Sequence, residues 1–190
     1  MNRKMMILMV AVVATVLPAV AVADVMVTGS VSGSGVMAMD AFTVQPGSNY
    51  ASAHSSSGFT WTASHINESE ILGDISVGIM SNETIYEVNV LDINFSSSGY
   101  FNLTVNVPTV LPGSGTAEFP ADSTIYFSTT PFTLTASGIS STQSVSLSNP
   151  GSTTLNFHHV TPSTTIYIAF EVGAGPYSGA SFSLSGVFSS

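Results

Sequence analysis

The chain has 190 residues with no cysteine, 11 acidic residues and only two basic ones, Arg3 and Lys4. Residues 24–190 therefore have no lysine or arginine and 11 acidic residues, a formal charge of −11 with neutral histidines. This composition excludes nucleic acid and anionic membranes as partners, because phosphate sites need ammonium or guanidinium groups, and it excludes disulfides and thiolate metal sites.

Residues 1–23 have the three parts of a secretory signal peptide. The basic start "MNRK" precedes an apolar run, and Ala21-Val22-Ala23 gives the small-residue pattern before a cleavage point at Asp24. A retained membrane anchor is the alternative, although the apolar run is barely long enough to span a bilayer. We expect a secreted chain, cleaved before Asp24, without a membrane segment after cleavage.

Residues 24–39 alternate with the two-residue period of a β-strand. The stretch "DVMVTGSVSGSGVMAM" has no Lys or Pro, and no charge between Asp24 and Asp40, so it lacks the features that usually block pairing at a sheet edge. Its length of roughly 45 Å exceeds what most strands within a domain need. One row of this strand comprises Val25, Val27, Gly29, Val31, Gly33, Gly35, Met37 and Met39. The residues alone leave two interpretations open: a first strand of a monomer, or a donor strand that completes another subunit's sheet.

Residues 40–190 are predicted to form a single all-β domain, a jelly-roll-like β-sandwich. Turn motifs such as "QPGSN", "LPGSG" and "NPGS" separate stretches of alternating polarity. The only candidate helix is a short one near "NESEILGDI", at 67–75. The expected strands are 58–64, 75–80, 84–95, 100–111, 123–130, 131–137, 144–148, 153–160, 164–173 and 180–188.

The clearest predicted hairpin is 85–107, with its turn centred on Ser98. Such a turn would place Asn94 and Asn102 opposite each other on the solvent face. The apolar row of the second strand comprises Phe101, Leu103, Val105 and Val107.

Four N-x-[ST] sequons, which are acceptors for N-glycosylation in exported proteins, lie close together in the sequence. Their asparagines are Asn67, Asn82, Asn94 and Asn102. Single triplets of this kind arise by chance in a chain rich in Ser and Thr, so the alternative is that none is modified. The clustering favours a glycosylated patch.

No enzyme signature is present: the chain has no G-x-S-x-G and no H-E-x-x-H motif. His158 and His159 are adjacent on a predicted strand, so we expect one to be buried, the other exposed, and no shared metal. The chain is predicted not to be an enzyme, and no catalytic or metal-binding residue is assigned.

Calcium is the one cofactor kept as an alternative to none, because it prefers several carboxylate and carbonyl oxygens. No D-x-[DN]-x-[DN]-G loop is present, so an ordinary solvated acidic face is the favoured interpretation. The acidic groups concerned are Glu68, Glu70 and Asp74, and separately Glu118 and Asp122.

The overall layout resembles the donor-strand-assembled archaeal surface filaments, the threads and bundling pili related to the TasA/camelysin family. The resemblance rests on the signal peptide, the Val/Gly/Ser-alternating stretch 24–39, and one Cys-free β-domain rich in Thr and Ser; it is one of composition and not of a sharp motif. It implies a jelly-roll subunit, donor-strand complementation by residues near 25–39, and a role in adhesion or biofilm cohesion. The clustered sequons agree with the glycosylated members, and calcium-assembled tubular cannula proteins look like relatives too.

The predicted function is therefore that of a structural subunit of an extracellular filament, a pilus or thread. Its partners would be identical subunits in a head-to-tail polymer and neighbouring filaments in bundles. The final strand, with Phe182, Leu184 and Phe188 on one face, is the candidate wall of the groove that receives the donor strand.

Two alternatives remain: a monomeric carbohydrate-binding β-sandwich and an S-layer-type protein. Carbohydrate binding would use exposed aromatic side chains from the set Tyr50, Trp61, Tyr100 and Tyr177. A secreted hydrolase would need a converging catalytic set, which the sequence does not provide.

Overall fold

The computed structural model describes residues 41–66, 70–80, 82–110, 117–136, 138–139, 141, 143–176 and 178–190. The predicted signal peptide and donor strand, including its row from Val25 to Met39, lie outside the described residues. The compact unit that contains the β-strands spans Ala38–Ser190.

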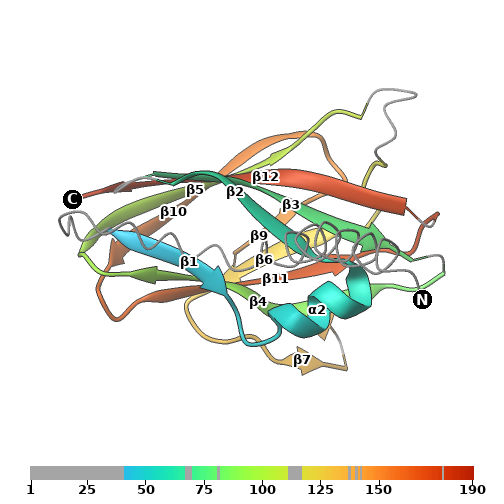
Figure 1. Ribbon diagram of the computed structural model, residues 1–190, viewed down its shortest axis with the longest axis horizontal. Helices are drawn as coiled ribbons and strands as arrows, with labels where there is room; N and C mark the ends of the chain where they lie inside the picture. The colour runs from blue at the N-terminus through green and yellow to red at the C-terminus, as the bar shows by residue number, and fades with distance from the viewer. Residues whose placement is uncertain are drawn as a thin grey trace, which may run out of the picture. The chain divides into compact units, whose positions relative to one another are not determined.

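Two five-stranded antiparallel sheets pack face to face, as Figure 1 shows. Sheet A has the order β1 (Phe42–Pro46), β4 (Ile85–Phe95), β11 (Thr165–Val172), β6 (Thr124–Ser128) and β9 (Gln143–Ser146). Sheet B has the order β10 (Gly151–Val160), β5 (Gly99–Val107), β12 (Ser178–Ser189), β3 (Glu70–Ile79) and β2 (Thr60–Ile66). A small ladder, β7 (Leu134–Thr135) with β8 (Gly138–Ile139), and one helix, α2 (Tyr50–Ser57), complete the described elements.

The pairing of eight of these strands is that of a jelly roll, which confirms the predicted fold. Among β3–β6 and β9–β12, the first strand pairs with the last (β3 with β12) and the second with the seventh (β4 with β11). The third pairs with the sixth (β5 with β10) and the fourth with the fifth (β6 with β9). This is the pattern of one long antiparallel ribbon rolled into two sheets. β1 and β2 extend one side of the roll.

The alternating polarity of the strands places their apolar rows between the sheets. In β5 the predicted row from Phe101 to Val107 is buried, with Phe101 and Val105 fully enclosed. In β12, Phe182, Leu184 and Phe188 are buried as well, but β12 lies in the middle of sheet B between β5 and β3. These three side chains therefore belong to the closed core of the sandwich.

The predicted hairpin and the predicted helix were wrong. Residues 85–107 are not a hairpin, because β4 lies in sheet A and β5 in sheet B, so the turn at 96–98 crosses between the sheets. Asn94 and Asn102 consequently lie on the outer faces of opposite sheets. Residues 70–75 belong to strand β3, and the helix lies at Tyr50–Ser57 instead.

Candidate functional site: an open flank between the sheets

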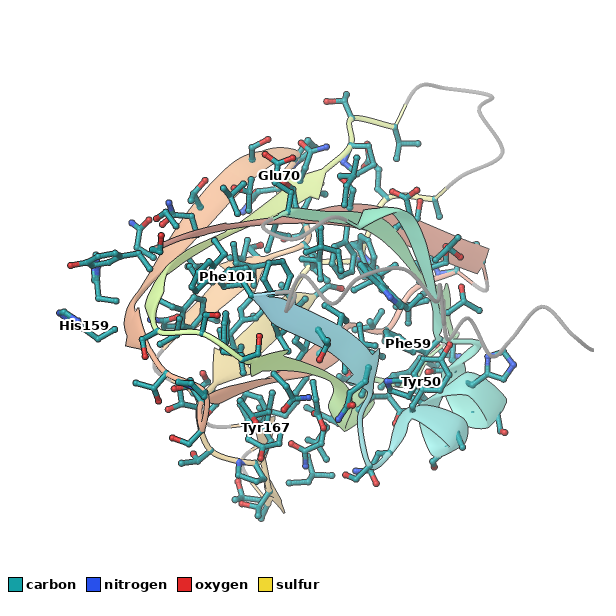
Figure 2. The ribbon with its side chains drawn as sticks, turned by 60° about the vertical axis from the view of Figure 1, so that its left-hand side comes forward. Tyr50, Phe59, Glu70, Phe101, His159 and Tyr167 are labelled. Atoms are coloured by element: carbon teal, nitrogen blue, oxygen red, sulfur yellow. The ribbon has the colours of Figure 1, made fainter. Side chains whose placement is uncertain are left out.

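The sandwich has two flanks, each formed by one edge strand of each sheet. The first flank, between β1 and β2, is closed over part of its length by α2, whose Ala53 and Ser57 are buried, while Val44 and Pro46 of β1 face inward and keep exposed surface. The Phe59 ring stacks on Phe170 with centroids 5.3 Å apart, and Tyr50 meets it edge-on at 5.5 Å. Figure 2 shows Tyr50 and Phe59 together beside the helix. Gly58 ends α2 in the left-handed conformation, so the chain turns directly from the helix into β2.

The second flank, between β9 and β10, is open and is the candidate site. β9 pairs only with β6, and β10 only with β5, within the part of the chain that the structure describes. Thr153 and Leu155 of β10 face the interior, because they pair with the inward-facing Val105 and Leu103. Thr153 is nevertheless exposed and Leu155 only half-buried, so no described element covers the inner side of β10 there.

A cleft of about 550 Å³ opens on this flank. Its lining comes from the second half of β10, the turn that follows it, the start of β9 and the segment after β6. The lining residues are Thr129, Gln143, Asn156, Phe157, His158, His159, Val160, Ser163, Thr164 and Thr165. The cleft therefore has an apolar base, from Phe157 and Val160, and a rim of uncharged polar groups and two histidines.

Gln143 is the residue whose chemistry stands out in the cleft. It pairs with the fully buried Phe127, so its side chain faces the interior of the sandwich. Its Oε1 atom is buried and has no hydrogen-bond partner among the described residues. A buried amide oxygen without a donor costs free energy, roughly 1–3 kcal/mol, which a donor brought in by another chain would recover.

The free edge of β9 offers regular backbone groups for pairing. The Leu147 N–H donates to the Ser123 carbonyl at 2.8 Å, on the β6 side. Because backbone direction alternates along a strand, the N–H and C=O groups of Ser144 and Ser146 point away from β6. Both serine side chains are exposed, and β9 contains no charged residue or proline.

The edge of β10 is interrupted near its end. Its register with β5 is regular from Gly151 to Phe157 and then shifts before Val160, and His159 has a positive φ of 58°. This bulge makes both His158 and His159 exposed, which corrects the prediction that one of them is buried. Both rings lie beside Tyr100, with centroids 5.9 and 5.5 Å away, and Figure 2 shows His159 on the opposite side of the molecule from Tyr50.

The sequon asparagines occupy different environments. Asn82 is exposed in a turn with a φ of 63°, and Asn102 is exposed on the outer face of sheet B. Asn94 is half-buried on the outer face of sheet A, where its Oδ1 accepts a hydrogen bond of 2.7 Å from the Thr165 hydroxyl. Asn67 lies outside the described residues. Of the described sequons, Asn82 and Asn102 are the accessible acceptors, and they do not share one patch with Asn94.

The acidic residues that the structure describes lie apart from one another on the surface. Glu70 and Asp74 lie on the exposed outer row of β3, and Glu118 and Asp122 are exposed in loops. Glu68 lies outside the described residues. Within the described ranges there is no group of three or more His, Cys, Asp or Glu side chains that could hold a metal ion.

Three groups on sheet A have raised pKa values: Tyr126, Tyr86 and Asp92. The Tyr126 hydroxyl donates to Glu171 Oε2 at 2.9 Å, and burial together with this bond raises the pKa of Tyr126 to about 12. The charge of Glu171 also raises the pKa of Tyr86. Burial raises the pKa of Asp92, whose Oδ1 is buried and has no hydrogen-bond partner among the described residues. These groups lie on β4, β6 and β11, and Tyr126 is paired with Ser144 of β9.

The aromatic residues considered for carbohydrate binding do not form one exposed face. Tyr50 and Trp61 pack against the core, while Tyr100 is exposed at the start of β5. Tyr177 lies outside the described residues.

Neither Gln143 nor the open flank is predictable from the sequence pattern alone. The strand at 144–148 was predicted, but its position at a sheet edge depends on pairing with β6, which is distant in the sequence. The one signal in the sequence is that Gln143 is a polar residue in the same row as the apolar Val145, two positions later.

Comparison with known proteins gives no further assignment: no family model matches the chain, and no curated protein or solved structure is detectably similar to it. Among the described residues, no helix has the length and apolar character needed to cross a membrane.

Proposed function

We propose that this chain is a secreted structural subunit of an extracellular filament, in which residues 25–39 of one copy enter the open flank of the next. The observation that carries the proposal is the flank between β9 and β10, where inward-facing side chains are uncovered beside a free strand edge. An added strand supplies both an apolar row for the cleft and backbone groups for the edge.

The chemistry of residues 25–39 is complementary to that of the flank. The row that begins with Val25, Val27 and Val31 is apolar, and its glycines allow close approach of the backbone. Neither β9 nor β10 contains an acidic or basic residue. Residues 24–190 carry a formal charge of −11, but the strand 25–39 is uncharged, so its contact with β9 and β10 brings no like charges together. Each fully buried valine side chain contributes about 1.5–3 kcal/mol to the free energy of binding. Several of them therefore contribute several kcal/mol, from which the entropic cost of association is subtracted.

The position of Ala41 fixes where residues 25–39 join their own domain. Ala41 accepts a hydrogen bond from the Ser96 N–H, so the chain enters sheet A at the end where β4 finishes. Through the register of β4, β11 and β6, this is the end at which β9 begins with Gln143. Four strand spacings, roughly 19 Å, separate the entry point of the chain from the open flank. A directional exchange of strands continues into a filament, whereas a reciprocal exchange closes a dimer.

The test is negative-stain electron microscopy of residues 24–190 beside residues 40–190, with circular dichroism to verify folding. We expect filaments from the longer chain and folded monomers from the shorter one. Val31→Asp places a charge in the apolar row and should also abolish filaments, whereas the matched control Ser32→Asp, in the opposite row, should retain them.

Three results would contradict the proposal. Folded monomers of the longer chain under all salt and calcium concentrations would place residues 25–39 in their own domain. Discrete dimers would indicate reciprocal exchange without a filament. Filaments from residues 40–190 would show that another surface drives assembly.

A further inference from the structure

The geometry points to β9, and not β10, as the edge to which the incoming strand of a second copy pairs, so that the strand extends sheet A and covers the inner row of β10. This inference rests on the proposed function and specifies its acceptor. The occupant is the segment 25–39 of a second copy.

The first argument is the regularity of the two edges. β9 pairs with β6 without a register shift over Gln143–Ser146, and its free edge has no charge, proline or bulge. β10 has a bulge at His158 and His159, where the left-handed backbone of His159 turns the edge away from a flat pairing geometry. A bulge is one of the means by which proteins block pairing at an edge.

The second argument is what remains uncovered. Thr153 and Leu155 face inward from β10 but retain exposed surface, so the missing cover lies on the side of sheet A. A strand beside β9 directs its own inward row towards these residues. A strand beside β10 would extend sheet B and leave that inner row open.

The third argument is Gln143. Its buried Oε1 lies at the start of β9, in the inward row of the acceptor strand, and lines the cleft. The inward row of the incoming strand has no side-chain donor, so the donor for this oxygen would be a backbone N–H, which the glycines of that row leave accessible. We therefore expect the inserted strand to supply the donor that the free subunit lacks.

Disulfide trapping tests the assignment, because the chain contains no cysteine and every thiol is an introduced one. If the valine row faces inward, then Ser30, Ser32 and Ser34 face the same outer side as Ser144 and Ser146 of β9. Each donor serine is changed to Cys and combined with Ser144→Cys, Ser146→Cys, Ser152→Cys or Thr154→Cys in residues 24–190. The last two positions lie on the outer row of β10. Neighbouring strands bring Cα atoms within the 4.4–6.8 Å that a disulfide needs.

We expect covalent ladders of subunits from at least one donor position with Ser144→Cys or Ser146→Cys, and none with the β10 positions. Ser185→Cys, on the central strand β12, is the matched control and should give no ladder, because both of its edges are already paired.

Each other outcome overturns a defined part of the account. Ladders with the β10 positions alone would move the acceptor to sheet B and leave the filament intact. Disulfides within one subunit, at monomer mass, would support the β9 edge and overturn the exchange between copies. Filaments without a ladder at either edge would place the acceptor elsewhere on the molecule.

Discussion

The two flanks of this sandwich are built from the same kinds of strand and differ in whether a helix covers them. Between β1 and β2, the helix α2 and the stacked rings of Phe59 and Phe170 fill part of the space between the sheets, although Val44 and Pro46 of β1 keep exposed surface. Between β9 and β10, the connection at 147–150 is short and leaves a cleft. The missing cover at β9 and β10 is local, because the core alongside it is complete, with Leu103 and Ile125 fully buried.

The largest effect is expected on the closed flank, from Phe59→Ala. Phe59 is fully buried, and its loss leaves a cavity beneath α2, which should lower the free energy of unfolding by about 3–5 kcal/mol. Urea denaturation of residues 24–190 under monomeric conditions measures this value. Leu134→Ala, at a side chain that is 54% exposed, is the control and should change stability by less than about 0.5 kcal/mol. A small effect of Phe59→Ala would mean that this flank is not closed.

Leu155→Ala on the open flank should destabilise the monomer by only about 1 kcal/mol, because the side chain is half-buried. Its neighbour in the register, Leu103, is 1% exposed, and Leu103→Ala should cost about 2–5 kcal/mol. In the filament Leu155 contacts the incoming strand, so its side chain contributes more to assembly than to the stability of the monomer. We expect Leu155→Ala to raise the concentration required for filament formation, measured by sedimentation. Equal costs for the two variants in the monomer would show that the flank is already covered.

Gln143→Leu should stabilise the monomer by about 1 kcal/mol, because it removes a buried oxygen that has no donor. The same change should weaken assembly, since it also removes the acceptor offered to the incoming strand. Thermal denaturation of the monomer and sedimentation of the polymer measure the two effects. A monomer destabilised by this change would indicate that the amide already has its partners.

Asp92→Asn should give the smallest effect, a gain in monomer stability of less than about 1 kcal/mol at pH 7, because the group is partly exposed. Asp92 lies on β4 opposite Gln45 of β1, next to the closed flank. Burial raises the pKa of Asp92 in the folded state, so the folded state binds its proton more tightly than the unfolded one. Stability therefore falls as the pH rises from the ordinary carboxyl pKa through the raised one, and the gain from Asn should vanish below about pH 3. A gain that is independent of pH would contradict this origin.

Much of the fold follows from the local pattern of residues. The alternation in β5 and β12 predicts both the strands and their buried rows, because one face of each strand must be apolar. The helix α2 was missed because "YASAHSSS" has no apolar periodicity, and only Gly58 marks its end. The 85–107 stretch was assigned to one sheet because alternation does not say whether a short turn stays in a sheet or crosses to the other.

The candidate site was less predictable, because it depends on contacts between distant segments. The environment of Gln143 is set by Phe127 and by the second half of β10, and the sequence pattern does not show how these segments come together. The exposure of both His158 and His159 results from a bulge, which reverses the expected alternation at one position. The donor strand was predicted from its own residues, and it remains a prediction.

Hydrogen exchange of the backbone amides, compared between monomeric and assembled residues 24–190, tests the central claim most directly. The account predicts that the amides of Ser144 and Ser146, which point away from β6, exchange fast in the monomer and become protected on assembly. The amides of β2, on the closed flank, should keep the same protection in both forms. New protection at β2, with none at β9, would contradict the assignment of the open flank as the site where subunits join.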